Sequence, residues 1–323
     1  MRISPKILFC SILLFLGLQS RAQNETYLLP FDSRVDINPA LAGLDKNNSY
    51  HTGNQYSFVN SEQTYNLFYA TWDSYSEKLK GGVALSFSQG MISEQDISTS
   101  SFGFSYSGFP IKTKNGKILL SVGTDMVAAT KQWTVAFLDK VITDENDVPI
   151  GPGESFLRYF ILKPKFGFLW VNNTLQIGLT STVSHTRNVS YSLIEPTTNL
   201  GYTLYISKKI DKRIRDLYSR PFQLSPELVV FYHEEAFVSR LRLLSEHTDK
   251  TWGFFIQNDF TNNIHTLGGT IGYQRNYMRF NLNAGMGIPG ISDYNAFLCE
   301  LSLNIVVPPF SNSKNNPWAP KKN

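Results

Sequence analysis

The side chains best suited to chemistry are four of the five acids in the segment 138–156, namely Asp144, Glu145, Asp147 and Glu154. Carboxylate oxygens are the ligands that Ca²⁺ prefers, so the cluster raises the question of a calcium site. The four acids do not follow the spacing of a calcium-binding loop. We therefore interpret the segment as a solvated acidic loop.

Other catalytic and metal-binding patterns are also missing from the sequence. The five histidines are scattered one to a segment, without pairs at ligand spacing, so they do not indicate zinc. The glycines around Gly268 are not followed by a helix and form no nucleotide-binding fingerprint, and there is no GxSxG motif. We expect no catalytic residue, no metal and no cofactor. The histidines are His51, His185, His233, His247 and His265.

One short segment, Ile37 to Gly43, has an unusual composition for this chain. It reads Ile-Asn-Pro-Ala-Leu-Ala-Gly. Proline fixes φ and keeps the preceding Asn38 extended, while Asn38 can hydrogen-bond within its own turn. Ala40, Ala42 and Gly43 permit close backbone approach. The simpler interpretation is a tight turn against a barrel wall and the functional one is a plug or gate, and under both we expect Asn38, Pro39, Ala40, Ala42 and Gly43 to contact the lumen.

The elements that must position these residues are amphipathic strands. From Met278 to Ile288 the apolar side chains occupy alternate positions, with Arg279, Asn281 and Asn283 between them. A period of two gives a strand one apolar and one polar face. Similar segments recur along the chain and predict about fourteen strands. We place them at 49–59, 63–73, 81–90, 95–108, 117–130, 157–170, 173–186, 199–210, 222–233, 236–247, 250–260, 264–274, 277–287 and 295–307.

Composition favours lipid over a protein core as the environment of the apolar faces. Charged residues make up 17% of the chain and aromatic residues 14%, whereas soluble domains carry about a quarter charged residues. The polar faces are rich in Gly, Ser, Thr and Asn, which suits a hydrated lumen. Backbone groups in lipid must all be paired, so a spanning sheet has to close on itself. We predict an all-β, antiparallel outer-membrane β-barrel with an N-terminal plug-like segment, the alternative being a periplasmic all-β protein.

Aromatic residues also gather near the ends of the predicted strands, as expected of the girdles at a membrane interface. The clearest group is Tyr65, Phe68, Tyr69, Trp72 and Tyr75. In the last hairpin but one, we expect Arg275 and Asn276 to form the two-residue connection between strands.

The first residues predict an export signal. A basic start is followed by the apolar run Ile7 to Leu18 and by small residues suited to cleavage after Ala22. Cleavage removes three basic residues and no acidic one, so the net charge falls from +4 to +1, and nucleic acid is not an expected partner. We divide the chain into a signal peptide (1–22), an N-terminal plug or turn segment (23–47), a barrel (48–307) and a disordered tail (308–323). We expect export to the outer membrane, with the segments 138–156 and 186–198 as long loops on its extracellular side.

The signal, the motif Asn38-Pro39-Ala40-Leu41-Ala42-Gly43, the aromatic-rich strands and the segment Ile264 to Tyr273 together resemble the PorP/SprF family. These are outer-membrane proteins of Bacteroidetes associated with type IX secretion and, in some members, gliding motility. The resemblance implies a non-enzymatic barrel that exports a large secreted adhesin-like protein, or anchors it at the surface, with other type IX components and outer-membrane lipid as further partners. Loop residues of such a barrel are candidate contacts for the secreted partner, here Asp144, Asp147, Pro149 and Glu154.

Two other functions remain open. Asn38, Pro39 and Ala40 also match the N-terminal hatch of the fatty-acid channel family, so the alternative is a FadL-like channel for small hydrophobic molecules. Such a channel needs a continuous apolar pocket beside the hatch. A general porin is disfavoured because the strands carry few of the charges that line a wide ionic pore.

Overall fold

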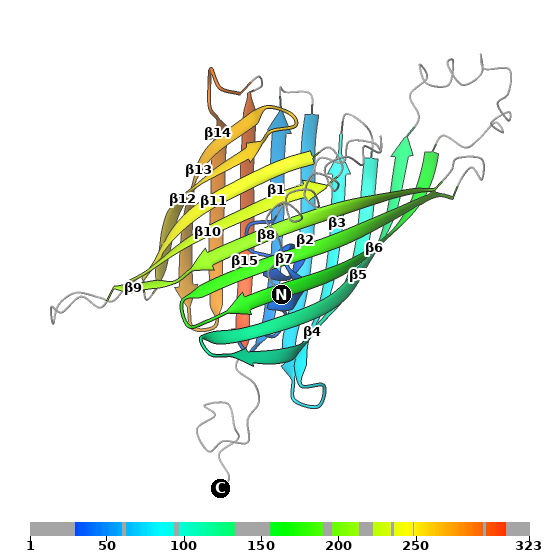
Figure 1. Ribbon diagram of the computed structural model, residues 1–323. Helices are drawn as coiled ribbons and strands as arrows, with labels where there is room; N and C mark the ends of the chain where they lie inside the picture. Colours follow the sequence, from blue (N-terminus) through cyan, green and yellow to red (C-terminus); the bar gives the residue numbers. More distant parts are fainter. Residues whose placement is uncertain are drawn as a thin grey trace, which may run out of the picture.

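The strands form one closed antiparallel sheet (Figure 1). The computed structural model describes residues 30–59, 63–93, 97–132, 156–189, 196–212, 222–233, 236–247, 249–292 and 295–307. Apart from β8 and β9, which both pair with β10, each strand pairs with its neighbour in sequence. Because β15 pairs with β1 and β10 pairs with β11, the described sheet has no free long edge. The strands are β1 (Asn48–Val59), β2 (Gln63–Ser76), β3 (Gly81–Ile92), β4 (Ile97–Thr113), β5 (Gly116–Gln132), β6 (Phe156–Val171), β7 (Leu175–Asn188), β8 (Thr197–Lys208), β9 (Ile210–Lys212), β10 (Phe222–His233), β11 (Ala236–Glu246), β12 (Lys250–Asp259), β13 (Ile264–Arg275), β14 (Met278–Gly287) and β15 (Ala296–Val307).

These fifteen labels describe a fourteen-stranded barrel. β8 and β9 are separated by the single residue Lys209, and both pair with β10. They therefore act as one interrupted strand. The predicted strand number is confirmed, and β14, for example, starts one residue from its expected beginning. The alternating pattern was sufficient to place the strands because a slip of one residue would turn every side chain to the wrong face.

The apolar faces point outward. On β14 and its neighbour β15, Phe280, Met286 and Leu301 are exposed, and Met286 keeps 69% of its surface accessible. The residues between them, such as Asn283 and Glu300, are fully buried inside the barrel. An apolar outer wall around a polar interior matches a barrel whose solvent is lipid, so this is a transmembrane β-barrel of the outer-membrane type.

The prediction that the aromatic cluster on β2 belongs to one membrane-interface girdle is wrong. Tyr65 and Tyr69 are buried inside the barrel, and the Tyr69 hydroxyl donates a hydrogen bond to Glu300. Consecutive side chains on a strand alternate, so only Phe68 and Trp72 of this cluster face outward. A girdle does form, but across strands, at the end where β1 begins. Its members are Tyr50, Trp72, Tyr106, Trp170, Trp252 and Tyr273.

That end of the barrel carries several short turns, whereas the longest connection between consecutive strands, from β5 to β6, leaves from the opposite end. Two residues join β4 to β5, three join β6 to β7 and two join β13 to β14. Short turns face the periplasm in outer-membrane barrels, so we assign this end to the periplasmic side. The β5–β6 and β7–β8 connections then both leave from the extracellular end. The turn between β13 and β14 is Asn276–Tyr277 rather than Arg275–Asn276, because Arg275 still belongs to β13. Asn276 adopts the left-handed conformation (φ 53°) that asparagine tolerates.

The segment preceding β1 lies within the ring of strands, where Figure 1 shows it in dark blue. It contains the single-turn helix α2 (Arg34–Ile37) and the 3₁₀ turn η1 (Pro39–Leu41). Ile37, Ala40 and Leu41 join inward-facing side chains of several strands in one buried cluster, which includes Leu169 and Val229. Within the described ranges, no helix is long and apolar enough to cross a membrane.

Replacing Ile271 by Arg is expected to destabilise the barrel in a lipid bilayer. Ile271 is 63% exposed on the outer wall and pairs with Trp252 of the girdle. A charge on the lipid face costs about 2–4 kcal/mol at the bilayer midplane and about 0–1 kcal/mol at the interface, so a loss of about 1 kcal/mol is expected at this level. The measurement is the free energy of unfolding of the protein in liposomes by urea titration. The matched control is Ile291→Arg, since Ile291 has a similar exposed fraction of 58% but lies between β14 and β15. Equal losses for both variants would argue against a lipid-facing wall at Ile271.

Candidate functional site

The Asn38 side chain ties the N-terminal segment to the barrel wall. Asn38 is fully buried. Its Oδ1 accepts a hydrogen bond from the Ala40 N–H at 2.8 Å, and its Nδ2 donates to the Phe168 carbonyl of β6 at 3.1 Å. The first bond caps the 3₁₀ turn, as asparagine commonly does at this position. The second bond fixes that turn against one particular strand.

Backbone carbonyls on either side of Asn38 are held by hydroxyl groups of the wall. The Ile37 carbonyl accepts from Thr180 Oγ1 of β7 at 3.2 Å, and the Ala40 carbonyl accepts from Ser107 Oγ of β4 at 3.1 Å. Pro39 is the first residue of the turn, where its missing N–H costs nothing. The segment thus forms hydrogen bonds with three different strands within four residues.

Glycines on both partners allow this close contact. Gly43 has φ of 60°, and a side chain there would come within 2.7 Å of Gly82 Cα and of the Ser74 carbonyl. A Cβ on Gly82 would lie 1.9 Å from the Ala42 carbonyl oxygen. The Gly43 N–H donates to Asp73 Oδ2 at 2.9 Å. The small residues of the motif therefore lie where the segment backbone touches the backbone of β2 and β3.

A second anchor is a buried ion-pair network at Asp32. Its carboxylate lies 3.1 Å from Arg242 Nη1, and Arg242 Nη2 lies 3.1 Å from Glu227. Asn281 and Ser302 also donate hydrogen bonds to Asp32. Burial alone would raise the pKa of Asp32, but the Arg242 charge and these hydrogen bonds outweigh burial and lower the pKa to about 2. Asp32 is therefore an anion held by three strands, β11, β14 and β15.

Phe31 is the apolar part of the same anchor. Its ring is fully buried, lies 4.2 Å from the Arg240 guanidinium and contacts Phe255 edge-on at 4.6 Å between centroids. Its N–H donates to both carboxylate oxygens of Glu300, at 2.9 and 3.1 Å. Arg240 Nη2 donates to the Pro30 carbonyl at 3.2 Å. Residues of the barrel wall therefore contact the Pro30 carbonyl, the Phe31 ring and the Asp32 carboxylate, which belong to three consecutive residues.

Asp36 has a different environment from Asp32. Burial raises its pKa, and the charge of Lys165 and a hydrogen bond from Ser33 only partly oppose that effect. Lys165 itself forms an ion pair with Asp125 of β5. The neighbours of Asp32 thus outweigh the cost of burying its charge, while the neighbours of Asp36 do not.

Sequence reasoning did not find the residues of this second anchor. Charges on the strands are scarce, and the few that occupy inward positions carry no local motif. The signal was present, because a charge on the polar face of a lipid-exposed strand is costly unless it has a partner inside. The residues concerned are Glu227, Arg240, Arg242 and Glu300, which face Phe31 and Asp32.

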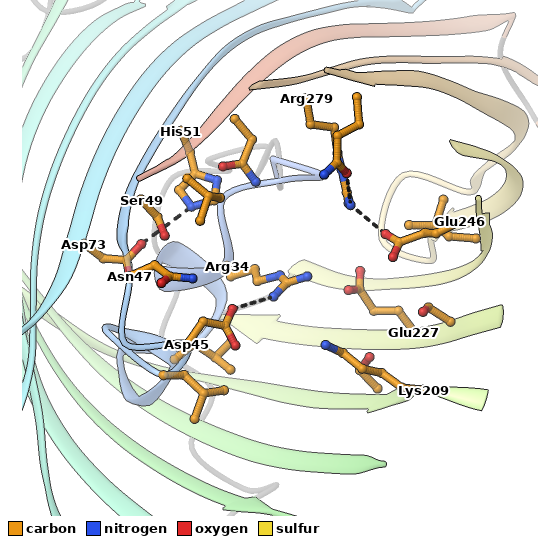
Figure 2. A pocket seen from close by; sticks show the side chains of 18 of the residues that line it. Arg34, Asp45, Asn47, Ser49, His51, Asp73, Lys209, Glu227, Glu246 and Arg279 are labelled. Carbon is orange, nitrogen blue, oxygen red and sulfur yellow. Dashed lines mark hydrogen bonds and ion pairs between the residues drawn. The ribbon is translucent and has the colours of Figure 1, made fainter. Parts of the chain in front are cut away.

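A cavity of about 410 Å³ lies on the periplasmic side of the N-terminal segment. Figure 2 shows charged side chains of both signs pointing into it. Arg34 lies 3.8 Å from Asp45, Arg279 lies 2.7 Å from Glu246, and His51 lies 3.5 Å from Asp73. The lining mixes these charged groups with apolar side chains such as Val35, Leu41 and Leu44, so it is not the mainly apolar pocket that a hydrocarbon needs.

The structure brings together only some of the sequence-predicted sites. Asn38, Pro39, Ala40, Ala42 and Gly43 lie together inside the barrel. The predicted loop contacts Asp144, Asp147, Pro149 and Glu154 lie outside the described residues, as do the predicted signal peptide and tail. Within the described part of the chain, no three His, Cys, Asp or Glu side chains are grouped so that they could hold a metal ion.

An apolar outer wall, a polar lumen and fourteen closed antiparallel strands define an outer-membrane β-barrel. No protein-family model and no curated protein matches the chain.

Solved barrel structures do show a similar fold. CdiB from Acinetobacter baumannii has a TM-score of 0.46 at 10% identity, over 80% of this chain and 60% of its own. The toluene transporter TodX of Pseudomonas putida has a TM-score of 0.44 at 10% identity, over 85% and 94%. Omp33 of A. baumannii has a TM-score of 0.41 at 9% identity, over 81% and 99%. The chain thus spans less than two thirds of CdiB, and these similarities concern the fold alone.

Proposed function

We propose that this protein is a non-enzymatic accessory barrel of type IX secretion, of the PorP/SprF kind, which assists export or surface anchoring of one large adhesin-like protein. In this proposal the barrel does not conduct its partner. It remains closed by the N-terminal segment and binds the partner through its surfaces.

The observation that carries the proposal is the fixation of the motif segment inside the barrel. Asn38, Ala40 and Gly43 each bond to a different strand, and Asp32 adds a buried ion pair on the opposite side. Removing one partner of a buried ion pair typically costs about 3–5 kcal/mol. A segment held at so many points favours a permanent part of the wall over a gate that opens for each passing molecule.

The cavity supports a protein-binding role over the alternative of a FadL-like hydrocarbon channel. A hydrophobic ligand needs a mainly apolar pocket, because it cannot replace the water around charged groups. This cavity places Arg34, Glu227 and Arg279 among its lining residues. Such a surface suits polar polypeptide on the periplasmic side.

The test is a pull-down from detergent-solubilised outer membrane of the native host, with an affinity tag after Asn323. One large secreted protein with a type IX C-terminal domain should be enriched over a tagged unrelated barrel. Deleting the gene should remove that protein from the cell surface, as measured by surface proteolysis of intact cells.

A deletion strain that displays all its type IX proteins normally would refute the proposal. Loss of growth on, or uptake of, a hydrophobic compound in the same strain would support the channel alternative instead. A separate variant tests the proposed loop contacts. In it, Asp144, Asp147 and Glu154 are replaced by the corresponding amides and Pro149 is replaced by Ala. Unchanged surface display would exclude that loop while leaving the rest of the barrel as the binding surface.

A further inference from the structure

The outer wall of the barrel carries charge only at its two ends. Across the middle of the described strands the outward positions hold uncharged side chains, mostly Phe, Leu, Ile, Val and Met, with Asn54, Pro164 and Tyr202 among the others. At the extracellular end, the outward positions of those strands hold two charged side chains, Arg158 of β6 and Arg187 of β7, and both are exposed. The two charges have the same sign and lie on neighbouring strands.

The strand register places these two arginines close together. Arg187 is paired with Phe160, and the Val189 N–H donates to the Arg158 carbonyl at 2.8 Å. Arg158 and Arg187 are therefore diagonal neighbours on one face, a relation that separates the Cα atoms by about 7–8 Å. Long arginine side chains at this separation can reach one common anion.

The height of the pair on the wall matches the boundary of the membrane. On β6 the outward residues run from Trp170 in the periplasmic girdle to Phe160, ten residues away. At about 3.3 Å per residue and a strand tilt of about 40°, this run spans about 25 Å, the height of the apolar band of an outer-membrane barrel. Arg158 is the next outward residue beyond Phe160, so it lies at the level of the lipid headgroups.

A polar contact on the same wall marks the same boundary. His185 faces outward two residues before Arg187, and its Nδ1 lies 3.0 Å from Thr198 Oγ1 of β8. His185 is paired with Leu162, the second outward residue from the upper end of the apolar band, and a histidine and a threonine in contact fit this upper edge of the band better than its middle. The basic pair therefore sits directly above the apolar band and beside a polar patch.

We propose that Arg158 and Arg187 form a binding site for a phosphorylated lipid headgroup of the outer leaflet. Guanidinium groups bind phosphate with paired hydrogen bonds and are more weakly hydrated than ammonium groups, so they suit this task at a membrane surface. The apolar band below, with Phe160 and Leu162, receives the acyl chains of the same lipid. The site is independent of the lumen and of the secretion role.

The experiment measures binding of bisphosphorylated lipid A to the purified full-length protein in detergent. The double variant Arg158→Ala/Arg187→Ala is expected to bind about 30-fold more weakly, since each surface arginine contributes about fivefold in affinity for an anionic lipid. Dephosphorylated lipid A should bind both proteins equally. The control is Lys208→Ala/Arg275→Ala, which removes two exposed basic residues from the periplasmic rim and should leave binding unchanged.

Equal binding of bisphosphorylated lipid A by the wild type and the folded double variant would overturn the proposal. Full displacement of the lipid by an equal concentration of inorganic phosphate would also overturn it, because the site would then be one for free anions. An equal loss in the periplasmic-rim control would assign the effect to total charge. If the double variant does not fold, Arg187→Gln alone keeps most of the side-chain volume and should still bind about fivefold more weakly.

Discussion

Replacing Asp32 by Asn is expected to free the N-terminal segment from the lumen wall. The variant leaves Arg242 with one carboxylate instead of two and places an amide opposite the donors Asn281 and Ser302. Loss of one partner from a buried ion pair costs about 3 kcal/mol or more. The readout is maleimide labelling of Val35→Cys, a buried position on the segment, with Cys10 and Cys299 replaced by Ser. The labelling rate should rise by about 100-fold.

Asp36→Asn is the matched control for this experiment. The same substitution is made four residues later in the same segment, but burial raises the pKa of Asp36, so its charge is a cost to the folded protein. Removing that charge should leave labelling unchanged or slower. Faster labelling in Asp36→Asn than in Asp32→Asn would contradict the assigned roles.

The same contrast predicts a dependence on pH. The pKa of Asp32 is lowered to about 2, against about 3.9 in an unfolded chain. Its contribution to stability is therefore complete above pH of about 4 and is lost as the pH falls through about 2. Pepsin digestion of the segment should distinguish wild type from Asp32→Asn at pH 4, and the difference should shrink towards pH 2. A constant difference over this range would show that the Asp32 charge is not what holds the segment.

Replacing Gly82 by Val is expected to open the barrel. A Cβ at this position would lie 1.9 Å from the Ala42 carbonyl oxygen and 2.9 Å from the Gly43 nitrogen, and these are backbone atoms that cannot rotate away. The strand itself accepts valine, because β-branched residues favour strands. The barrel should therefore fold while the motif segment is displaced from β3. Single-channel recording in planar bilayers should then show ion conductance that the wild type lacks.

Gly269→Val is the control for the conductance measurement. Gly269 lies on the outer wall, where the nearest atom to an added Cβ is the Gly253 carbonyl oxygen at 3.7 Å. This variant should stay closed. Conductance in the wild type, or a closed Gly82→Val barrel that still folds, would contradict the view that the segment seals the lumen.

Strand number, strand positions and the direction of the apolar face could all be predicted from the sequence. Alternation supplies this information because each side chain on a strand has only two choices of face, and one residue such as Phe280 or Asn281 decides the register for its neighbours. The motif from Asn38 to Gly43 could be placed near a wall for a similar reason. Its proline, asparagine and small residues restrict the backbone locally, without reference to distant residues.

The buried charges could not be paired from the sequence, because their partners are far away in the chain. Asp32 meets Arg242, and the Phe31 N–H meets Glu300, 269 residues later. No local pattern indicates which inward residue of one strand meets a non-strand segment. The aromatic girdle was misassigned on β2 for a related reason, since residues gathered in sequence, such as Phe68 and Tyr69, separate to opposite faces once the strand forms.

The position of Asp32 also has a consequence for biogenesis. Ser302, which donates a hydrogen bond to Asp32, lies on β15. β15 is the final strand of the barrel and pairs directly with β1. The N-terminal segment, which is synthesised first among the described residues, can therefore complete its contacts only after β15 has been synthesised. The pairing of β15 with β1 closes the barrel and also brings Ser302 to Asp32. We therefore expect the packing of the N-terminal segment to be completed together with the β15–β1 pairing, and a variant that loses the Asp32 contacts to close the barrel less efficiently.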